Sequence, residues 1–403
     1  MITLQGKTVL VGVTGGIAAY KAAVLVSALV KLQCHVEVIL TENATQFITP
    51  LTFEQLTGNR AMVDTFDRNF SHQVEHVSLA HRTDLVIIAP ATANVCAKLA
   101  HGLADDMLTT TVLACSCPKL IAPAMNTGMY QNPVTQDNLK ILRGYGWQVI
   151  DPVSGRLACG DVGAGKLPEP ADLLQYILRE LALPHDLAGK QVLVTAGPTQ
   201  EALDPVRYLT NHSSGKMGYA LAKMAMLRGA QVTLVTGPTA LPPVPFVEMV
   251  PVVSAQEMFQ AVVSRQEKAD MIIKAAAVAD YTPVSYQEEK LKKQEGEFSL
   301  PLLRTQDILG YLGSHRRPGQ VICGFSMETQ NLEANSRKKL ESKGVDLICA
   351  NNLKTEGAGF GVDTNVLTLL TRQGTEELPL LSKEDAANCV LDRALALLEQ
   401  KAY

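Results

Sequence analysis

Short runs of mostly apolar residues recur along the chain, and longer segments with helical spacing of apolar positions lie between them. The runs at 8–13, 35–40, 85–89 and 119–122 are rich in Val, Ile, Leu and Ala. Strands buried on both faces have this composition and occur in parallel sheets. The segment 18–32 lacks Pro and is long enough for the crossover helix that two parallel strands require. The first half therefore predicts an α/β fold.

A similar alternation begins again near residue 187. The segment LAGKQVLVTAGPT (187–199) resembles LQGKTVLVGVTGG (4–16), which fits either a duplicated domain or the general likeness of first strands. Both interpretations predict two Rossmann-like parallel-sheet domains, 1–186 and 187–403. We expect Ser382 to cap a C-terminal helix that has Asp385 in its first turn. In the second half we expect strands at 231–235, 271–274, 321–324, 347–350 and 366–371. From residue 171 onward we expect helices at 171–183, 216–227, 333–343 and 383–399.

The alternation lapses at 151–170, where Pro, Gly and Asp occur without an apolar period. This composition predicts a long loop or flap. Its GDVGAGKL stretch is close to a phosphate-binding P-loop, but Leu167 stands where magnesium requires Ser or Thr, and Pro168 and Pro170 follow where a helix should start. A flap that carries Cys159 is the favoured interpretation, although a lone Cys is more often a small buried apolar residue.

Composition narrows the function to small-molecule chemistry. The 403 residues predict two or three domains, and the net charge of −4 supplies no overall field for a polyanion. Aromatic residues, at 5%, are too few for stacking on single-stranded nucleic acid. Eight cysteines without a CxxC pair are typical of reduced thiols. No apolar run has the length of a membrane span, so we expect a soluble, cytoplasmic protein that binds neither nucleic acid nor membrane.

A glycine turn in the first half predicts a phosphate-binding site, and nearby loops and a histidine are further candidates for ligand contact. Gly15 and Gly16 join the first strand to its helix, where free amides and the helix dipole attract anions. The turn is not GxGxxG, so a mononucleotide such as FMN fits better than a dinucleotide, with tight packing as the alternative. The loops 90–94 and 123–130 follow strands at the same sheet edge. His76 is a candidate for proton transfer, or a structural histidine.

The second half contains a comparable set of motifs. Ser213, Ser214 and Gly215 precede a predicted helix and would cradle a phosphate, with Arg207 or Lys216 adding charge. An ordinary Ser-rich helix cap is the alternative. Basic clusters at 290–293 and 337–343 favour a nucleoside triphosphate site, although charge runs usually face water. Asp280, after an apolar run, could contact a base or magnesium.

The motifs GGIAAYK, PATAN, PAMNTGMY, ACGDVGAGK, TAGPT, DPVRYLTNHSSGKMG, AAAVADY and EKLKK follow one another over almost the whole chain. Together they closely resemble the bifunctional bacterial phosphopantothenoylcysteine decarboxylase/phosphopantothenate–cysteine ligases of coenzyme A synthesis. The resemblance implies a flavin-containing cysteine decarboxylase fold for 1–186 and a CTP-dependent ligase for 187–403. It also implies small-molecule substrates, Mg²⁺ and a homo-oligomer with trimeric decarboxylase cores and dimeric ligase domains, up to a dodecamer.

For the decarboxylase, the resemblance implies that flavin oxidises the cysteine thiol of the substrate to a thioaldehyde, which permits loss of carbon dioxide. His76 matches the essential histidine of the family, Asn126 the residue that holds the departing carboxylate, and Cys159 the proton donor of the reductive step. Met125 would contact the substrate. The residues expected to bind FMN are Gly15, Gly16, Thr41, Thr92 and Asn94.

For the ligase, the resemblance implies that the carboxylate of 4'-phosphopantothenate attacks the α-phosphate of CTP, and that cysteine then displaces CMP from the acyl-cytidylate. Asn211 matches a residue associated with this intermediate, and Lys290 a lysine needed for turnover. Asp280 would also be a Mg²⁺ ligand. Substrate contacts are expected from Arg207, Ser213 and Gly215, and CTP contacts from Lys274, Ala275, Ala276, Asp280, Lys290, Gln306, Asp307, Ile308, Leu309, Phe325, Lys339 and Lys343.

Three short stretches depart from the family pattern. Lys166-Leu167 replaces Arg-Met, Thr305-Gln306 replaces Asn-Pro, and Ser326-Met327 replaces two alanines. Two other functions compete with the bifunctional enzyme: a flavin-binding regulatory protein without turnover, and a flavoprotein of the same fold that modifies another substrate. The presence of His76, Asn126 and Cys159 together with a ligase half favours the enzyme of coenzyme A synthesis.

Overall fold

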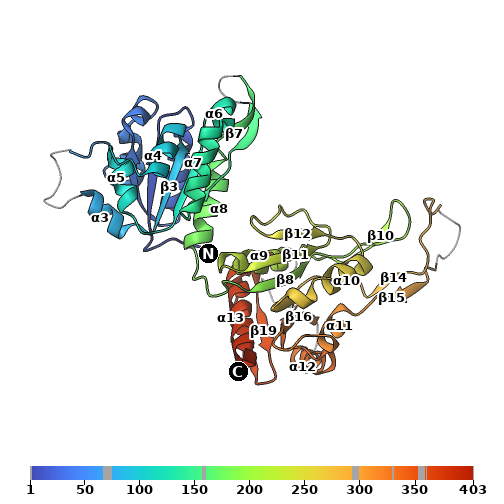
Figure 1. Cartoon of the computed structure of the whole chain (residues 1–403). Helices are drawn as coiled ribbons and strands as arrows, with labels where there is room; N and C mark the ends of the chain where they lie inside the picture. The colour runs from blue at the N-terminus through green and yellow to red at the C-terminus, as the bar shows by residue number, and fades with distance from the viewer. Residues whose placement is uncertain are drawn as a thin grey trace. The chain divides into compact units, whose positions relative to one another are not determined.

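The computed structural model describes residues 2–66, 75–156, 160–292, 299–328, 331–352, 359 and 361–402. The chain forms two compact units, Ile2–Leu183 and Pro184–Tyr403. Each unit has a central sheet with helices against it (Figure 1), so the predicted α/β class is confirmed. Across the described part of the chain, no helix combines the length and apolar content needed to cross a bilayer.

The first unit has a five-stranded parallel sheet with the order β2-β1-β3-β4-β5. Every residue of the central strand β3 is buried, as the continuous apolar run predicts. Its strands are β1 (Thr8–Val13), β2 (His35–Leu40), β3 (Leu85–Ala91), β4 (Lys119–Pro123) and β5 (Gln148–Val149). Its helices are α1 (Ala19–Lys31), η1 (Glu42–Gln46), α2 (Pro50–Thr57), α3 (Glu75–Arg82), α4 (Ala93–His101), α5 (Met107–Ala114), α6 (Thr127–Gln131), α7 (Pro133–Gly144) and α8 (Pro170–Leu181).

The segment expected to be a loop at 151–170 forms an antiparallel hairpin, β6 (Val153–Arg156) and β7 (Val162–Lys166). The prediction missed these strands because a tertiary contact supports them. The amide of Met125 donates to the Gly165 carbonyl at 3.0 Å. A Cβ on Gly165, whose φ is 142°, would lie 2.2 Å from the Met125 carbonyl oxygen, so only glycine permits this approach.

The second unit has an eight-stranded sheet with the order β12-β11-β8-β13-β16-β17-β19-β20. The expectation of a wholly parallel sheet is wrong at one edge, where β19 and β20 run antiparallel. These strands follow one another through a short turn, so no crossover helix marks them in the sequence. The strands are β8 (Gln191–Ala196), β11 (Gln231–Thr236), β12 (Glu248–Pro251), β13 (Met271–Lys274), β16 (Val321–Glu328), β17 (Leu347–Asn352), β19 (Leu367–Leu370) and β20 (Thr375–Glu377).

Helices cover this sheet, and three short antiparallel pairs extend from it. The predicted cap of the last helix is confirmed, because Ser382 Oγ accepts from the Asp385 amide at 3.1 Å. The helices are α9 (Lys216–Leu227), α10 (Ala255–Val263), η2 (Gln266–Lys268), α11 (Ile308–Ser314), α12 (Leu332–Lys343) and α13 (Lys383–Ala402). The short pairs are β9 (Glu201–Ala202) with β10 (Tyr208–Leu209), β14 (Tyr281–Pro283) with β15 (Leu302–Arg304), and β18 (Thr364–Asn365) with β21 (Leu381–Ser382).

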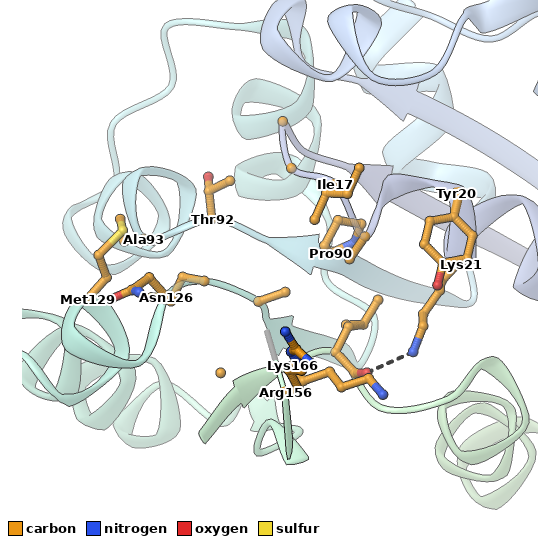
Figure 2. A pocket seen from close by; sticks show the side chains of 17 residues that line it. Ile17, Tyr20, Lys21, Pro90, Thr92, Ala93, Asn126, Met129, Arg156 and Lys166 are labelled. Carbon is orange, nitrogen blue, oxygen red and sulfur yellow. Dashed lines mark hydrogen bonds between the residues drawn. The ribbon is translucent and has the colours of Figure 1, made fainter. Parts of the chain in front are cut away.

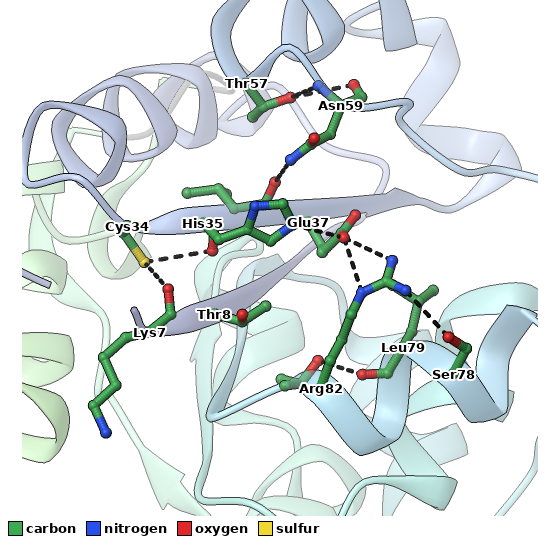
Figure 3. Close-up of polar contacts among 12 residues, drawn as sticks. Lys7, Thr8, Cys34, His35, Glu37, Thr57, Asn59, Ser78, Leu79 and Arg82 are labelled. Carbon is green, nitrogen blue, oxygen red and sulfur yellow. Dashed lines mark hydrogen bonds and ion pairs between the residues drawn. The ribbon is translucent and has the colours of Figure 1, made fainter. Parts of the chain in front are cut away.

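A buried carboxylate fastens α3 to the edge of the first sheet (Figure 3). The Glu37 side chain on β2 is 6% exposed. Its Oε1 accepts from Arg82 Nη2 at 2.7 Å and Nε at 3.1 Å, and lies 3.0 Å from His35 Nε2. A carboxylate withdrawn from water requires such partners. The Glu37–Arg82 pair therefore sets the position of α3, the helix that carries His76.

We predict that Arg82→Met lowers the free energy of unfolding of the first unit by about 1–3 kcal/mol, because Glu37 would stay buried without its cation. This loss of unfolding free energy is smaller than the loss expected for a fully buried ion pair, because the Arg82 side chain is 43% exposed. Trp147 is the only tryptophan and packs on the core of the first unit, so its fluorescence in a urea titration reports on this unit. Arg143→Met is the control because Arg143 pairs with the exposed Asp151; equal losses in both variants would contradict the prediction.

Candidate functional sites

The first unit has a cavity of about 460 Å³ at the carboxyl edge of its sheet, a volume typical of small-molecule sites. Figure 2 shows the side chains around it. They come from the β1–α1 turn, the loops after β3 and β4, and the β6–β7 hairpin. The cavity is lined by Gly15, Gly16, Ile17, Ala18, Tyr20, Lys21, Pro90, Thr92, Ala93, Ala124, Met125, Asn126, Met129, Arg156, Gly165, Lys166 and Leu167.

Thr14 ties two of these loops together. Its fully buried hydroxyl donates to the Pro90 carbonyl at 2.8 Å and accepts from the Thr92 amide at 2.9 Å. Thr92 in turn caps α4 by accepting from the Val95 amide at 3.4 Å. The wall of the cavity is thus held by hydrogen bonds that water does not reach.

The β1–α1 turn fits a phosphate group. A Cβ on Gly15 would lie 2.7 Å from Asn43 Cβ, whereas a Cβ on Gly16 would meet no atom within 4 Å and would enter the space beside the turn. Helix α1 begins at Ala19, so the positive end of its dipole lies beside the glycines, although the Ala19 amide already donates to the Gly16 carbonyl at 2.9 Å. The cavity also contains cationic side chains from Lys21, Arg156 and Lys166. Lys21 is already bound, since its Nζ donates to the Leu167 carbonyl at 3.1 Å and to Glu169 at 2.8 Å.

Asn126 combines a structural and an exposed polar contact. Its Oδ1 caps α6 by accepting from the Gly128 amide at 2.8 Å, and its Nδ2 donates to Asp161 Oδ2 at 2.8 Å. The cap fixes which end of the amide faces the helix. The amide nitrogen therefore faces away from α6, as a carboxylate-binding group must.

The predicted residues of the first unit divide into two groups. Gly15, Gly16, Thr92, Met125 and Asn126 line the cavity. The lining residues do not include Thr41, at the N-cap position of η1, Asn94, which is exposed, or His76 on α3. Cys159 lies outside the described residues. Sequence reasoning missed Lys21 and Arg156 as lining cations. The only signal for Lys21 was its place in the first turn of the helix after the glycines.

The second unit has a cavity of about 240 Å³ at the carboxyl ends of β13, β16 and β17. It lies where open α/β sheets usually bind ligands. Several backbone amides and four lysines surround it. It is lined by Ser213, Ser214, Gly215, Lys216, Met217, Gly218, Lys274, Ala275, Ala276, Ala277, Val278, Asp280, Phe325, Met327, Lys339, Asn351, Gly359, Asn365 and Lys383.

Buried threonines hold the loop after β13 against the end of β8. Thr195 Oγ1 accepts from the Ala276 amide at 3.1 Å, and Thr199 Oγ1 accepts from the Ala279 amide at 3.0 Å. Both threonines are fully buried. Gly215 starts α9 with a φ of 79°, and its added Cβ would lie 3.3 Å from the Gly197 backbone, so the turn needs glycine for its conformation and for this close approach.

Asn211 joins two sides of the second cavity without lining it. Its Nδ2 donates to the Ala277 carbonyl and its Oδ1 accepts from the Ser213 amide at 3.1 Å. Arg207 is exposed and pairs with Asp204, its Nε lying 3.1 Å from Oδ2. Lys290 is also exposed, and neither Arg207 nor Lys290 is among the lining residues.

A lysine cluster lies at the end of β13. The pKa of Lys274 is lowered to about 8, mainly by loss of hydration and then by the positive charges of Lys339 and Lys343 on α12, while Asp307 and Asp280 act in the opposite direction. Lys343 donates to Asp307, which caps α11. An anionic ligand would compensate the crowded positive charges.

The predicted CTP residues therefore divide in the same way as those of the first unit. The members that line the cavity are Lys274, Ala275, Ala276, Asp280, Phe325 and Lys339, joined by the predicted substrate residues Ser213 and Gly215. The predicted CTP residues that do not line the cavity are Gln306, Asp307, Ile308, Leu309, Lys343 and Lys290. Gln306 is exposed, whereas Ile308 and Leu309 are buried. Sequence reasoning missed Asn351 on β17, Asn365 on β18 and Lys383 at the start of α13, because these segments carry no recognisable motif.

A magnesium site would rest on few protein ligands. Within the described ranges, no group of three or more His, Cys, Asp or Glu side chains could hold a metal. Asp280 lines the second cavity. One carboxylate with substrate phosphates is a common arrangement for Mg²⁺, so the residues present fit an ion that arrives with a nucleotide.

Two family models match the chain, one in each unit. The model described as Flavoprotein matches residues 2–182. The model described as DNA/pantothenate metabolism flavoprotein C-terminal domain matches residues 187–398.

Curated relatives match at nearly full length. The chain is 47% identical over 403 residues to the coenzyme A biosynthesis bifunctional protein CoaBC of Bacillus subtilis (strain 168), covering 98% of each sequence. The protein of the same name from Escherichia coli (strain K12) is 40% identical over 403 residues, 99% of each. A crystal structure of a CoaBC C-terminal domain is 42% identical and covers 54% of this chain and 99% of that chain, with a TM-score of 0.47.

We predict that Lys274→Met stabilises the ligand-free second unit below pH 8 by about 1–3 kcal/mol. The folded pKa of Lys274, about 8, is below the unfolded value, so at lower pH the folded unit bears the full cost of keeping this partly buried lysine charged beside Lys339. The difference between variant and wild type should shrink as pH rises from 8 toward the unfolded pKa.

Thermal denaturation of both proteins across this pH range measures the difference. Lys338→Met on the exposed side of α12 is the control. A stabilisation by Lys274→Met that does not change with pH would contradict the charge argument.

Proposed function

The chain belongs to the family of coenzyme A biosynthesis bifunctional proteins, and we propose on this premise that its two units catalyse successive reactions. Residues 187–403 would couple 4'-phosphopantothenate to cysteine with CTP. Residues 1–186 would convert 4'-phospho-N-pantothenoylcysteine to 4'-phosphopantetheine with FMN. The observation that carries the proposal is the near-complete coverage of bifunctional relatives, combined with a cavity at the carboxyl edge of the sheet in each unit.

In the decarboxylase, FMN would be held by the amides of the β1–α1 turn and by Thr92. When bound, flavin supplies a two-electron oxidation of the substrate thiol that makes loss of carbon dioxide feasible. The residues of the chain bind and orient the substrate. Asn126 would direct its amide nitrogen at the substrate carboxylate, and Met125 would contact the substrate beside it. His76 and Cys159 would transfer protons.

In the ligase, the triphosphate would lie against the N-terminal end of α9, which begins at Lys216, and against the lysine cluster at the end of β13. These positive groups stabilise charge on the α-phosphate while the carboxylate of 4'-phosphopantothenate attacks and pyrophosphate leaves. Asn211, fixed between the Ala277 carbonyl and the Ser213 amide, would position the acyl-cytidylate. Cysteine then forms the amide bond and CMP leaves.

We also propose a homo-oligomer located in the cytoplasm; exposed apolar side chains in each unit support the association of copies. Ile17, just before α1, and Tyr20 and Val24 on α1 are more than half exposed. Leu303 and Tyr286 of the second unit are also 54% exposed, near the β14–β15 pair. Apolar side chains exposed in groups are typical of surfaces that another protein covers.

We predict that the purified protein absorbs visible light as a flavoprotein and releases pyrophosphate from CTP over many turnovers only when both 4'-phosphopantothenate and cysteine are present. The final product should be 4'-phosphopantetheine, identified by mass spectrometry. ATP, GTP and UTP in parallel reactions measure nucleotide selectivity. A protein that binds FMN but yields neither product would instead be the regulatory flavoprotein.

We predict that Lys290→Gln lowers CTP-dependent pyrophosphate release by about 10–1000-fold, since phosphoryl chemistry depends on positioned cations. Decarboxylation of supplied 4'-phospho-N-pantothenoylcysteine should not change, because that reaction belongs to the other unit. Lys292→Gln, at an equally exposed position, is the control. Equal loss of both activities in Lys290→Gln would argue against two separate sites.

A further inference from the structure

Asn126, the residue proposed to hold the substrate carboxylate, already binds a carboxylate of the protein. Its Oδ1 is engaged by the Gly128 amide, and its Nδ2 donates to Asp161 Oδ2 at 2.8 Å. Figure 2 shows Asn126 among the side chains that surround the cavity. Asp161 is exposed and directly precedes β7. An Asp carboxylate has the same chemistry as the carboxylate that the reaction removes.

The hairpin does not need this contact in order to dock. The Met125 amide donates to the Gly165 carbonyl at 3.0 Å, which joins the two backbones directly. Gly163 packs on Thr127 so closely that a Cβ there would lie 2.7 Å from Thr127 Oγ1. These backbone approaches hold β7 against the start of α6. The Asp161 carboxylate can therefore leave Asn126 while the hairpin stays in place.

The same contact leaves one polar group unsatisfied. Thr127 Oγ1 is buried and has no hydrogen-bond partner in the structure as described. A hydroxyl that is withdrawn from water without a partner destabilises the arrangement that buries it. The docked hairpin therefore leaves one hydrogen-bonding group beside Asn126 without a partner. A ligand can compete with the Asp161 side chain for Asn126 at this place.

We propose that Asp161 is a stand-in for the substrate carboxylate: it occupies the Asn126 amide in the substrate-free protein, and the carboxylate of the substrate displaces it. The proposal rests on the decarboxylase function proposed above. Two carboxylates on one amide would repel each other at short range, so the two states exclude one another. Asp161 thereby sets the affinity for ligands that carry a carboxylate at this position.

The proposal distinguishes ligands with and without a carboxylate. 4'-Phospho-N-pantothenoylserine has the carboxylate but no thiol for flavin to oxidise, whereas 4'-phosphopantetheine lacks the carboxylate. Removing the charge of Asp161 should strengthen binding of the serine compound by about tenfold, the order expected for one charge-assisted hydrogen bond. Binding of 4'-phosphopantetheine should stay within about twofold by the same argument.

The experiment is a calorimetric titration of both compounds into the full-length flavoprotein as wild type, Asp161→Asn and Asp161→Ala. The KM and kcat for 4'-phospho-N-pantothenoylcysteine are measured in parallel, and KM should fall about tenfold with kcat retained. Asp151→Asn is the matched control. Asp151 is also an exposed carboxylate and precedes the same hairpin, but it accepts hydrogen bonds from Arg143 and Tyr130 and not from Asn126.

If the Asp161 variants changed the affinity for both compounds equally, the proposal would be overturned, because the result would indicate a general effect on the hairpin. A fall in kcat for Asp161→Ala that Asp161→Asn restores would also overturn it, since Asp161 would then orient Asn126. Failure of wild type to decarboxylate contradicts the proposed function, whereas the titrations test the stand-in role without turnover. Wild-type protein that binds neither compound contradicts both.

Discussion

The loops at the carboxyl edge of each sheet are held together by threonine hydroxyls that no water reaches. In the first unit Thr14 joins the end of β1 to the loop after β3. In the second unit Thr195 joins the end of β8 to the loop after β13. If either loop shifted, a buried hydroxyl and a backbone group would lose their partners, which costs about 1–3 kcal/mol for each group. Both cavities therefore have walls that are fixed before a ligand arrives.

Strands buried on both faces were predictable because their apolar runs are continuous, as for β1 and β3. The β6–β7 hairpin was not predictable, since its glycines serve a contact with the loop after β4 that lies about forty residues earlier. The strand expected at 366–371 is present as β19, but its antiparallel direction and the neighbouring strand β20 were not predicted. A local pattern reports how a segment is buried, but not which distant backbone it approaches.

The same limit applies to the sites. Gly15, Gly16 and Ser213 could be placed from sequence because strand ends of a parallel sheet meet at one edge. His76 and Lys290 matched family positions, yet neither lines a cavity of its own unit. The direction of a side chain depends on the packing of its helix or loop, as Glu37 and Arg82 show for α3. Such long-range ion pairs have no signature in the local sequence.

Of the five buried side-chain oxygens without a hydrogen-bond partner in the described residues, two lie near the proposed ligand sites. Within the described residues, Thr127 Oγ1 lies beside Asn126, and Asn351 Oδ1 lines the second cavity. Lys274 adds a crowded buried charge at the same cavity. Each of these groups destabilises the ligand-free fold, and each has the chemistry to contact a polar ligand. A polar, anionic ligand that gave Asn351 Oδ1 and Lys274 partners at the second cavity would therefore stabilise this unit on binding.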